Sequence, residues 1–415
     1  MQSITGLLTL TLVLTALLGH NVSGILHYRL HFDDLLGKGT VNRIRELVLH
    51  GTRNESMDRP STSRRTAKHD DQARIHVFTY ANSEKSPVPE AFCRMVRSAL
   101  VNNVPVQILG WGQPWSRQNG MIQKVSVYHI QRNTTCALIF SQLIPLFPCV
   151  QVLAMWNQVH SLPSLADIVT FTDAYDVLWI RSSQHLMEQF KTIENHSEKH
   201  LLFSAECACF PLSIGKEGRK WCQIDYPPIP TNVTSLYRFL NSGLWMGRVW
   251  AARAVLDQVI LELVDTEPAS HYGVTNDQLV LAKLWVDRKL PHFVGLDYES
   301  QLFQNMNSHN ACDPQSDVFI SNADNNWYHW KPNNKSTAPA VLHFPGEAKE
   351  IFYRVEAKSW WYNAMEQRMA SLPTDQVPVV SHENHSMLNL SMICNTSTFD
   401  KIMNLNIHFR KNLSW

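Results

Sequence analysis

One stretch of the sequence, DIVTFTDAYDVLWI from Asp167 to Ile180, constrains the fold of this chain more than any other. Residues 168–172 are apolar or β-favouring, and the run is short enough to form a buried central strand of a parallel sheet. Asp173 and Asp176 follow it directly. Ligands of open α/β sheets bind at the carboxyl ends of the strands, so this pair predicts a site for a hard cation such as Mg²⁺ or Mn²⁺. The alternative is a surface turn, because Asp is a favoured turn residue.

Apolar, β-favouring runs alternate along the chain with runs of helical spacing, which predicts parallel βαβ units and an α/β fold. Strands are expected at 75–81, 104–109, 168–172, 201–205, 244–247, 294–297 and 340–346. Helices are expected at 89–102, 184–192, 253–264, 279–285 and 350–371, with a helix cap at 275–278 before the fourth. Residues 124–162 are ambiguous, with a helical pattern near 152–159, and are expected to form an insertion. A long loop is expected at 216–234, and the tail after Pro373 is expected to be polar and mobile.

The N-terminus carries the clearest targeting signal. Residues 4–19 are apolar apart from scattered Thr, and no formal charge precedes Arg29. This pattern predicts a secretory signal peptide over 1–24, followed by a variable leader or stem over 25–73. An uncleaved type II anchor is the alternative, and membrane attachment is expected only in that case. The net charge of +1 argues against nucleic acid as a partner, because such proteins need a basic face.

Glycosylation motifs and cysteines agree with the secretory route. Asn-x-Ser/Thr acceptors begin at Asn21, Asn54, Asn133, Asn195, Asn232, Asn334, Asn384, Asn389, Asn395 and Asn412. The eight cysteines are an even number, compatible with disulfides in an oxidising compartment. Proximity alone suggests the pair Cys136–Cys149 and a pair between Cys222 and either Cys207 or Cys209. We therefore expect a protein of the endoplasmic reticulum or Golgi lumen, or a secreted one.

Three further polar motifs follow in order, each with a simple structural alternative. Asn241-Ser242-Gly243 precedes an apolar strand, where Gly lets the backbone approach a ligand, but it is also an ordinary turn sequence. Asp277-Gln278 begins an apolar run, where a helix cap would explain the Asp. His343 ends the last strand, where a histidine is commonly a satisfied structural residue.

Taken together, FTDAYDV, LNSGLWMG, NDQL and the final His-x-x-Gly resemble the glycosyltransferase domain of the procollagen lysyl hydroxylase (PLOD) family. That family belongs to the metal-dependent nucleotide-sugar transferases of GT-A fold. The resemblance implies a GT-A-like, Rossmann-type mixed sheet, mostly parallel and flanked by helices, over 74–355. A helix end and a polar tail would follow over 356–415. An iron- and 2-oxoglutarate-dependent hydroxylase domain has no room after Arg354, so we expect a free-standing transferase.

The resemblance also implies a role for individual residues. Asp173, Asp176 and His343 would bind Mn²⁺ or Mg²⁺ against the diphosphate of a UDP-sugar, with Asp173 also at the donor. Tyr175 would pack on the uridine. The catalytic pair would be Asn241 and Asp277, near the donor sugar and the acceptor hydroxyl.

The resemblance extends to the sugar pocket, and it has two departures. Phe210 would lie beside the sugar, and Gly346 would belong to the donor site. Thr275 and Asn276 stand where the family has further acidic residues before Gln278. Phe344-Pro345-Gly346 stands where the family has Gly-Asn-Gly after the metal-binding histidine. Both departures concern the donor sugar and the acceptor rather than the metal.

The sequence thus predicts a metal-dependent glycosyltransferase of the secretory pathway. It would transfer galactose or glucose from a UDP-sugar to a hydroxyl acceptor on a protein, of hydroxylysine type, or on a glycan. One alternative is a non-catalytic secreted glycoprotein that uses the same scaffold for binding. Another is a glycogenin-like α-glycosyltransferase, which shares the order of the motifs. The presence of all three metal-ligand candidates favours an enzyme.

Overall fold

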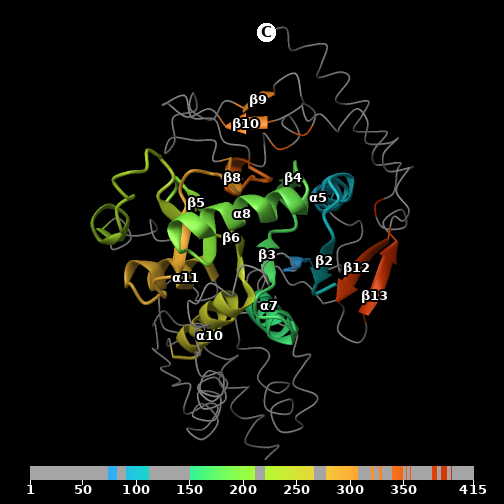
Figure 1. Cartoon of the computed structure of the whole chain (residues 1–415), viewed down its shortest axis with the longest axis horizontal. Coiled ribbons are helices and arrows are strands. Elements are labelled where there is room, and N and C mark those ends of the chain that lie inside the picture. The colour runs from blue at the N-terminus through green and yellow to red at the C-terminus, as the bar shows by residue number, and fades with distance from the viewer. Residues whose placement is uncertain are drawn as a thin grey trace, which may run out of the picture. The chain divides into compact units, whose positions relative to one another are not determined.

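The computed structural model describes the parts of the chain on which the predicted site depends (Figure 1). They are residues 73–81, 90–111, 150–210, 220–265, 277–306, 319–321, 327–329, 339–348, 376–380 and 385–389, with the single residues 352, 356 and 394. The predicted signal peptide or anchor lies outside them, as does the leader or stem up to residue 72. The proposed Cys136–Cys149 pair, most of the predicted insertion and most of the predicted helix at 350–371 also lie outside.

The main sheet has eight strands in the order β13-β12-β2-β1-β3-β6-β5-β7. Strands β6 and β13 run against the direction of the other six, so the sheet is mixed. The strand bounds are β1 Ile75–Tyr80, β2 Val106–Leu109, β3 Ile168–Thr172, β5 Leu201–Glu206, β6 Phe239–Arg248, β7 Val294–Asp297, β12 Gln376–Val380 and β13 His385–Asn389. The predicted GT-A-like fold class, a mixed α/β sheet with flanking helices, is confirmed.

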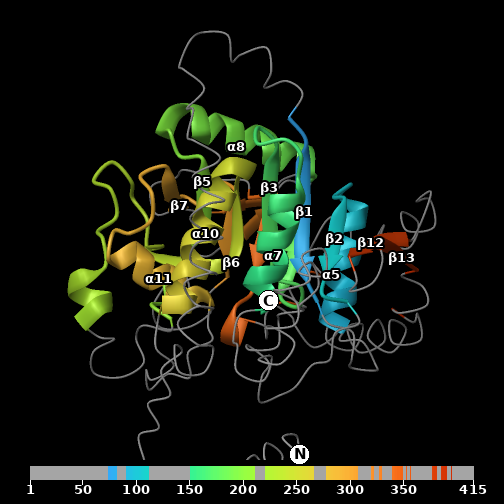
Figure 2. The same ribbon diagram turned by 90° about the horizontal axis from the view of Figure 1, so that it is seen from below.

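Helices cover both faces of this sheet, which is why its central strands are buried on both faces rather than on alternate residues. All residues of β3 are buried. One core cluster joins the sheet to helices α7 (Val150–Ser161), α10 (Val249–Asp265) and α11 (Asp277–Val286). Figure 2 shows α7 and α10 side by side across the strands. A second cluster joins the sheet to helices α5 (Glu90–Val101) and α8 (Ser183–Ser197).

Helix α8 shows how local sequence sets an element's boundary. Ser182 has extended backbone angles, and its hydroxyl accepts a hydrogen bond from the backbone N–H of His185 at 3.2 Å. A serine in this position satisfies one of the N–H groups that a helix start leaves unpaired. The helix therefore begins at Ser183, one residue before the predicted start.

A small second sheet, β4-β11-β8, lies against the main one and carries part of the predicted site. Its strands are β4 (Val177–Trp179), β11 (Val341–His343) and β8 (Phe303–Asn305). Strand β4 follows β3 after the short segment that contains Asp173 and Asp176. Strand β11 pairs antiparallel with β4 and parallel with β8. The described residues also include the hairpin-like pair β9 (Phe319–Ser321) and β10 (Trp327–His329), with a π-helix at Trp221–Asp225 and a 3-10 helix at Gly346–Ala348.

The segment after Pro373 is more than the polar tail that the sequence predicts. Strand β12 pairs with β2 and β13 pairs with β12, so the segment extends the main sheet by two strands. A disulfide joins Cys394 to Cys93 of α5, and Arg97 donates a hydrogen bond to the Cys394 carbonyl at 2.9 Å. Such short strands have little periodicity of their own, and a local sequence pattern does not show their pairing with a distant strand.

Several expected elements are confirmed with shifted ends. The helix predicted at 253–264 runs from 249 to 265, and the helical pattern near 152–159 belongs to α7. The turn predicted at Asn241-Ser242-Gly243 is instead the interior of β6. The predicted long loop at 216–234 contains the π-helix. No helix in the described part of the chain combines the length and the apolar character that crossing a membrane would require.

Candidate active site

The turn between β3 and β4 presents the two aspartates at the carboxyl end of the central strand. The backbone N–H of Asp173 donates to the Gly243 carbonyl on β6 at 2.8 Å. The Asp176 carbonyl accepts from the N–H of Phe344, just after β11, at 2.8 Å. The turn is therefore fixed by the main sheet on one side and by the small sheet on the other.

Strand pairing then brings His343 to the same place. His343 lies opposite Val177 on β4 and opposite Asn305 on β8, and only 2% of its surface is exposed. Its Nε2 atom lies 3.5 Å from Asp173 Oδ2 and 3.6 Å from Asp176 Oδ1. One ligand atom from each of the three residues lies within 4.8 Å of the others. The structure thus gathers the three side chains that the resemblance singled out.

This cluster fits a divalent cation. The buried Nε2 of His343 has no hydrogen-bond partner among the described residues, although it faces two carboxylate oxygens. Burying a polar atom without a partner is costly, and a shared cation would satisfy it. Carboxylate oxygens suit Mg²⁺ and Mn²⁺, while imidazole is a common ligand of transition metals. Within the described part of the chain, this is the one group of three such ligands.

The electrostatics of the cluster point the same way. Burial alone would lower the pKa of His343, but the negative charges of Asp176 and Asp173 outweigh it and raise the pKa to about 10. In the absence of metal the ring therefore holds a proton that balances the two carboxylates. A divalent cation would replace that proton, as metals do when they bind imidazole.

Gly243 leaves the room that such a site needs. A Cβ atom at this position would lie 2.5 Å from Asp173 Oδ2 and 2.8 Å from His343 Cε1. It would also lie 3.1 Å from Asn241 Oδ1. Any side chain would therefore fill the space between the ligands. The pairing of β6 with β5 is interrupted here, because the register shifts between Phe203 and Ser204. A bulge of this kind redirects a strand towards a site.

The two predicted catalytic residues lie on different elements. Asn241 lies on β6, is buried, and its Oδ1 accepts from the N–H of Gly243 at 3.0 Å. Asp277 begins α11 and lines a cavity together with Ser242, between β6 and the helices α7 and α10. Asn241 thus neighbours the metal-ligand cluster, whereas Asp277 approaches the adjacent residue of β6 from the helix side.

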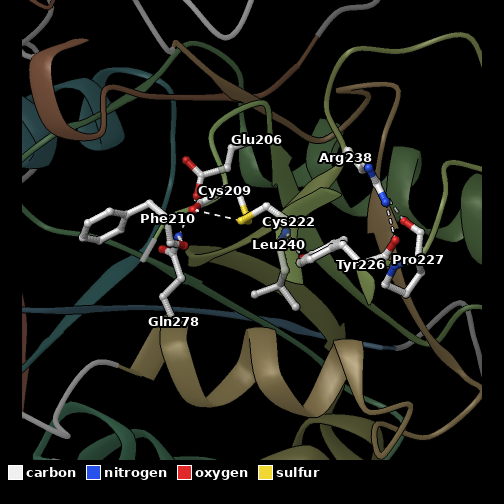
Figure 3. The surroundings of a disulfide bond; sticks show 9 residues. All are labelled: Glu206, Cys209, Phe210, Cys222, Tyr226, Pro227, Arg238, Leu240 and Gln278. Carbon is white, nitrogen blue, oxygen red and sulfur yellow. Dashed lines mark hydrogen bonds between the residues drawn. A yellow bond between two sulfur atoms is a disulfide. The ribbon is translucent and has the colours of Figure 1, made fainter. Parts of the chain in front are cut away.

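Phe210 and Gln278 are connected to each other beside the Cys209–Cys222 disulfide (Figure 3). The Gln278 side-chain amide donates to Glu206 Oε1 at 2.6 Å and to the Phe210 carbonyl at 2.7 Å. The Phe210 ring is 45% exposed. The disulfide Cys209–Cys222 holds the adjacent residue. It is one of the two pairings that proximity suggested, and Cys207 is also disulfide-bonded. The hydrogen bond from Gln278 to Glu206 connects the start of α11 to the end of β5.

The remaining predicted donor-site residues lie in the turn and after β11. Tyr175 is partly buried, and its ring centroid lies 6.3 Å from that of Phe92. Gly346 has a positive φ of 58°, and no other heavy atom of the described residues comes within 4 Å of an ideal Cβ there. The structure therefore places Tyr175 beside the aspartates and leaves open space at Gly346.

Sequence reasoning missed one buried residue of this site. Asn305 is fully buried, and its Oδ1 lies 2.8 Å from Nδ1 of His343. Its side-chain amide also reaches Ser204 and the Ala205 carbonyl on β5. The sequence Phe303-Gln304-Asn305 offers no signal for this role, because the contact depends on how β8 pairs with β11.

A known protein family matches the part of the chain that contains these site residues. The sequence profile of the PLOD GT domain, a glycosyltransferase domain, matches residues 151–366. The chain belongs to the PLOD GT domain family. The match contains Asp173, Asp176, Asn241, Asp277 and His343, and it begins after β1, α5 and β2.

Curated relatives of this PLOD GT domain protein are longer than it. A procollagen-lysine,2-oxoglutarate 5-dioxygenase of Drosophila melanogaster is 28% identical over 291 residues, covering 69% of this chain and 33% of the relative. A multifunctional procollagen lysine hydroxylase and glycosyltransferase of Caenorhabditis elegans is 27% identical over 217 residues, covering 52% of this chain and 24% of the relative. The chain thus spans a third or less of the length of these two proteins.

Among solved structures, mouse xyloside xylosyltransferase 1 in its apo form superposes with a TM-score of 0.34 at 10% identity. The superposition covers 66% of this chain and 98% of the mouse protein.

Proposed function

We propose that this protein is a divalent-metal-dependent glycosyltransferase that transfers a hexose, galactose or glucose, from a UDP-sugar to a hydroxyl group. The observation that carries the proposal is the convergence of Asp173, Asp176 and His343 around the space left by Gly243. Family membership supports the reaction class. The buried imidazole nitrogen facing two carboxylates supports the dependence on metal, with Mn²⁺ or Mg²⁺ as the candidates.

The residues of the site divide the chemistry between them. Asp173, Asp176 and His343 would hold the cation. When bound, a divalent cation offsets the charge that develops on the leaving diphosphate. Tyr175 would pack against the uridine. Asn241, fixed by its hydrogen bond to Gly243, would orient the donor sugar.

Asp277 would act on the acceptor side of the reaction. Asp277 lines the cavity next to Ser242, and we propose that its carboxylate orients the acceptor hydroxyl or takes its proton. The acceptor oxygen bonds to the anomeric carbon, the bond between that carbon and the diphosphate oxygen breaks, and UDP leaves. The acceptor proton passes to a base, for which Asp277 is the candidate. We propose a hydroxyl on a protein side chain, of hydroxylysine type, as the first acceptor to test. A relative from Caenorhabditis elegans is described as both a procollagen lysine hydroxylase and a glycosyltransferase, which supports this choice. A glycan hydroxyl is the second.

We also propose that the protein works in the lumen of the secretory pathway or is secreted. Two disulfides, Cys93–Cys394 and Cys209–Cys222, support an oxidising compartment. The ten glycosylation motifs support it independently. An enzyme that removes N-glycans should increase the gel mobility of the protein from cells. An unchanged mobility, with recovery from the cytosol, would refute the assignment.

The reaction is tested by a donor screen that measures UDP release from each UDP-sugar in the presence of Mn²⁺. Release should stop in EDTA and resume when Mn²⁺ is restored. Asp176→Asn should abolish most of the release, because it removes a charged ligand. Asp257→Asn is a matched control, since Asp257 is equally buried but accepts hydrogen bonds from Trp156 and His160 between α7 and α10.

Calorimetry of UDP binding gives the decisive comparison. UDP affinity should fall in EDTA for the wild-type protein and for Asp257→Asn alike. An affinity that is the same with and without metal would refute the metal site. Metal-dependent UDP binding without release from any UDP-sugar would instead support a binding role for this scaffold.

A further inference from the structure

The side chain of Asn305 connects the main sheet to the metal-ligand cluster. Asn305 ends β8 and is fully buried. Its Nδ2 donates to the Ala205 carbonyl at 2.8 Å and to Ser204 Oγ at 3.1 Å, both on β5. Its Oδ1 lies 2.8 Å from Nδ1 of His343. The nitrogen of this side-chain amide therefore forms hydrogen bonds to β5, and its oxygen forms one to β11.

These contacts decide the state of the His343 ring. The Ala205 carbonyl can only accept a hydrogen bond, so the Nδ2 end of the amide must face β5. The Oδ1 end then faces His343 and can only accept, so Nδ1 of the ring must carry the proton. Nε2 is left as the nitrogen that points at Asp173 and Asp176. When a cation replaces the proton on Nε2, the imidazole is neutral, keeps its proton on Nδ1 and presents the lone pair of Nε2 to the metal.

The orientation of the ring is also fixed. Asn305 lies directly opposite His343 in the parallel pairing of β8 with β11, so the backbone places the two side chains together. Ser204, which receives the Nδ2 hydrogen bond, is itself 3.4 Å from Asn241 Oδ1. The hydrogen-bond chain thus runs from the proposed sugar-orienting residue to the proposed metal ligand.

We propose that Asn305 is a positioning residue for His343, which sets the protonated nitrogen and the orientation of the ring so that Nε2 binds the divalent cation. This inference rests on the proposed metal dependence. It goes beyond that proposal because it predicts that metal affinity is controlled by a buried amide that does not bind the metal.

The test is Asn305→Leu, which keeps a similar volume and removes the acceptor for Nδ1. Mn²⁺ binding to the metal-free full-length protein is measured from the electron paramagnetic resonance signal of free Mn²⁺. Loss of a hydrogen-bond partner of a metal-binding histidine typically weakens metal affinity 10- to 100-fold, and we expect a loss of about this size.

Gln304→Leu is the matched control. Gln304 is the preceding residue, is as fully buried as Asn305, and donates to the Tyr237 hydroxyl and to the Asn305 carbonyl. Both variants should lower the thermal midpoint, because each leaves buried polar partners unsatisfied. Only Asn305→Leu should weaken Mn²⁺ binding. Equal Mn²⁺ affinities in Asn305→Leu and wild type would overturn the inference.

A second variant and a spectroscopic readout cover the case in which Asn305→Leu fails to fold. Asn305→Asp keeps an acceptor for Nδ1 while placing a carboxylate against the Ala205 carbonyl. In ¹⁵N-histidine-labelled protein with Mg²⁺, the wild type and Asn305→Asp should show a slowly exchanging proton on Nδ1 of His343. A wild type whose His343 proton lies on Nε2 would overturn the inference. A wild type that binds neither Mn²⁺ nor Mg²⁺ would overturn the proposed function as well, which separates the two failures.

Discussion

Gly243→Ala is the smallest change that should separate metal binding from folding in this protein. The added methyl group would lie 2.5 Å from Asp173 Oδ2 and 2.8 Å from His343 Cε1. These separations are well below normal van der Waals contact, so one of the two ligands must move. The His343 ring is buried and held by Asn305, whereas Asp173 is partly exposed. We therefore expect Asp173 to turn away from the site.

The size of the effect follows from the cost of inserting a methyl group into packed surroundings, about 1–3 kcal/mol. If this cost falls on the metal-bound state, metal affinity decreases about 5- to 150-fold, because about 1.4 kcal/mol corresponds to a factor of ten. If the Asp173 side chain instead rotates away from the site and relieves the clash, the cation loses a ligand and its affinity decreases by a similar factor. In either case the fold should lose little stability, since the side chain that moves has solvent to move into.

Two glycines of the same sheet provide matched controls. At Gly247, also on β6, a Cβ would lie 2.6 Å from the backbone oxygen of His200, which cannot move easily. Gly247→Ala should therefore destabilise the fold without changing metal affinity. At Gly295 on β7 the nearest atom is Cγ of Lys199 at 3.0 Å, part of a flexible side chain, so Gly295→Ala should change little.

The assay is Mn²⁺ titration by calorimetry, paired with urea unfolding of each metal-free variant. We expect weakened Mn²⁺ binding with near-wild-type stability for Gly243→Ala, and the reverse for Gly247→Ala. A Gly243→Ala protein that binds Mn²⁺ as tightly as wild type would refute the geometry proposed for the site.

Three further predictions follow from other contacts. Asp277→Asn keeps a polar residue in the first turn of α11 but removes the charge. It should lower kcat by about 10²-fold with little change in stability. Wild-type transfer rates in this variant would show that Asp277 only supports the helix. Burial alone would raise the pKa of Glu194, but hydrogen bonds from His200 and Arg248 outweigh it and hold the pKa below its usual range. The ionised Glu194 therefore stabilises the fold at neutral pH. In urea unfolding, the stability advantage over Glu194→Gln should disappear as the pH falls through the lowered pKa of Glu194 in the folded protein. A difference independent of pH would contradict the ion pair. Replacing both Cys93 and Cys394 by Ser should lower the free energy of unfolding by about 2–4 kcal/mol, and an unchanged calorimetric midpoint would show that this disulfide contributes nothing.

Much of the scaffold around the site could be predicted from local patterns. The apolar run 168–172 indicated a central strand, because a strand covered on both faces must be apolar throughout. The aspartates after it followed from the rule that ligands bind at the carboxyl ends of such strands. The pair Cys209–Cys222 was among the pairings that proximity suggested, since a short separation along the chain limits the distance between its ends.

Local sequence patterns did not determine which distant residues complete the site, and only the family resemblance connected His343 with the two aspartates. His343 reaches Asp173 and Asp176 because β11 pairs with β4, and Asn305 reaches His343 because β8 pairs with β11. The strands β12 and β13 and the disulfide Cys93–Cys394 likewise depend on which edges meet. Hydrophobic periodicity shows which face of a strand is buried, but it carries no information about which strand will lie beside it. That choice is made by the packing of the whole core, and it is what turns three separate motifs into one candidate metal centre.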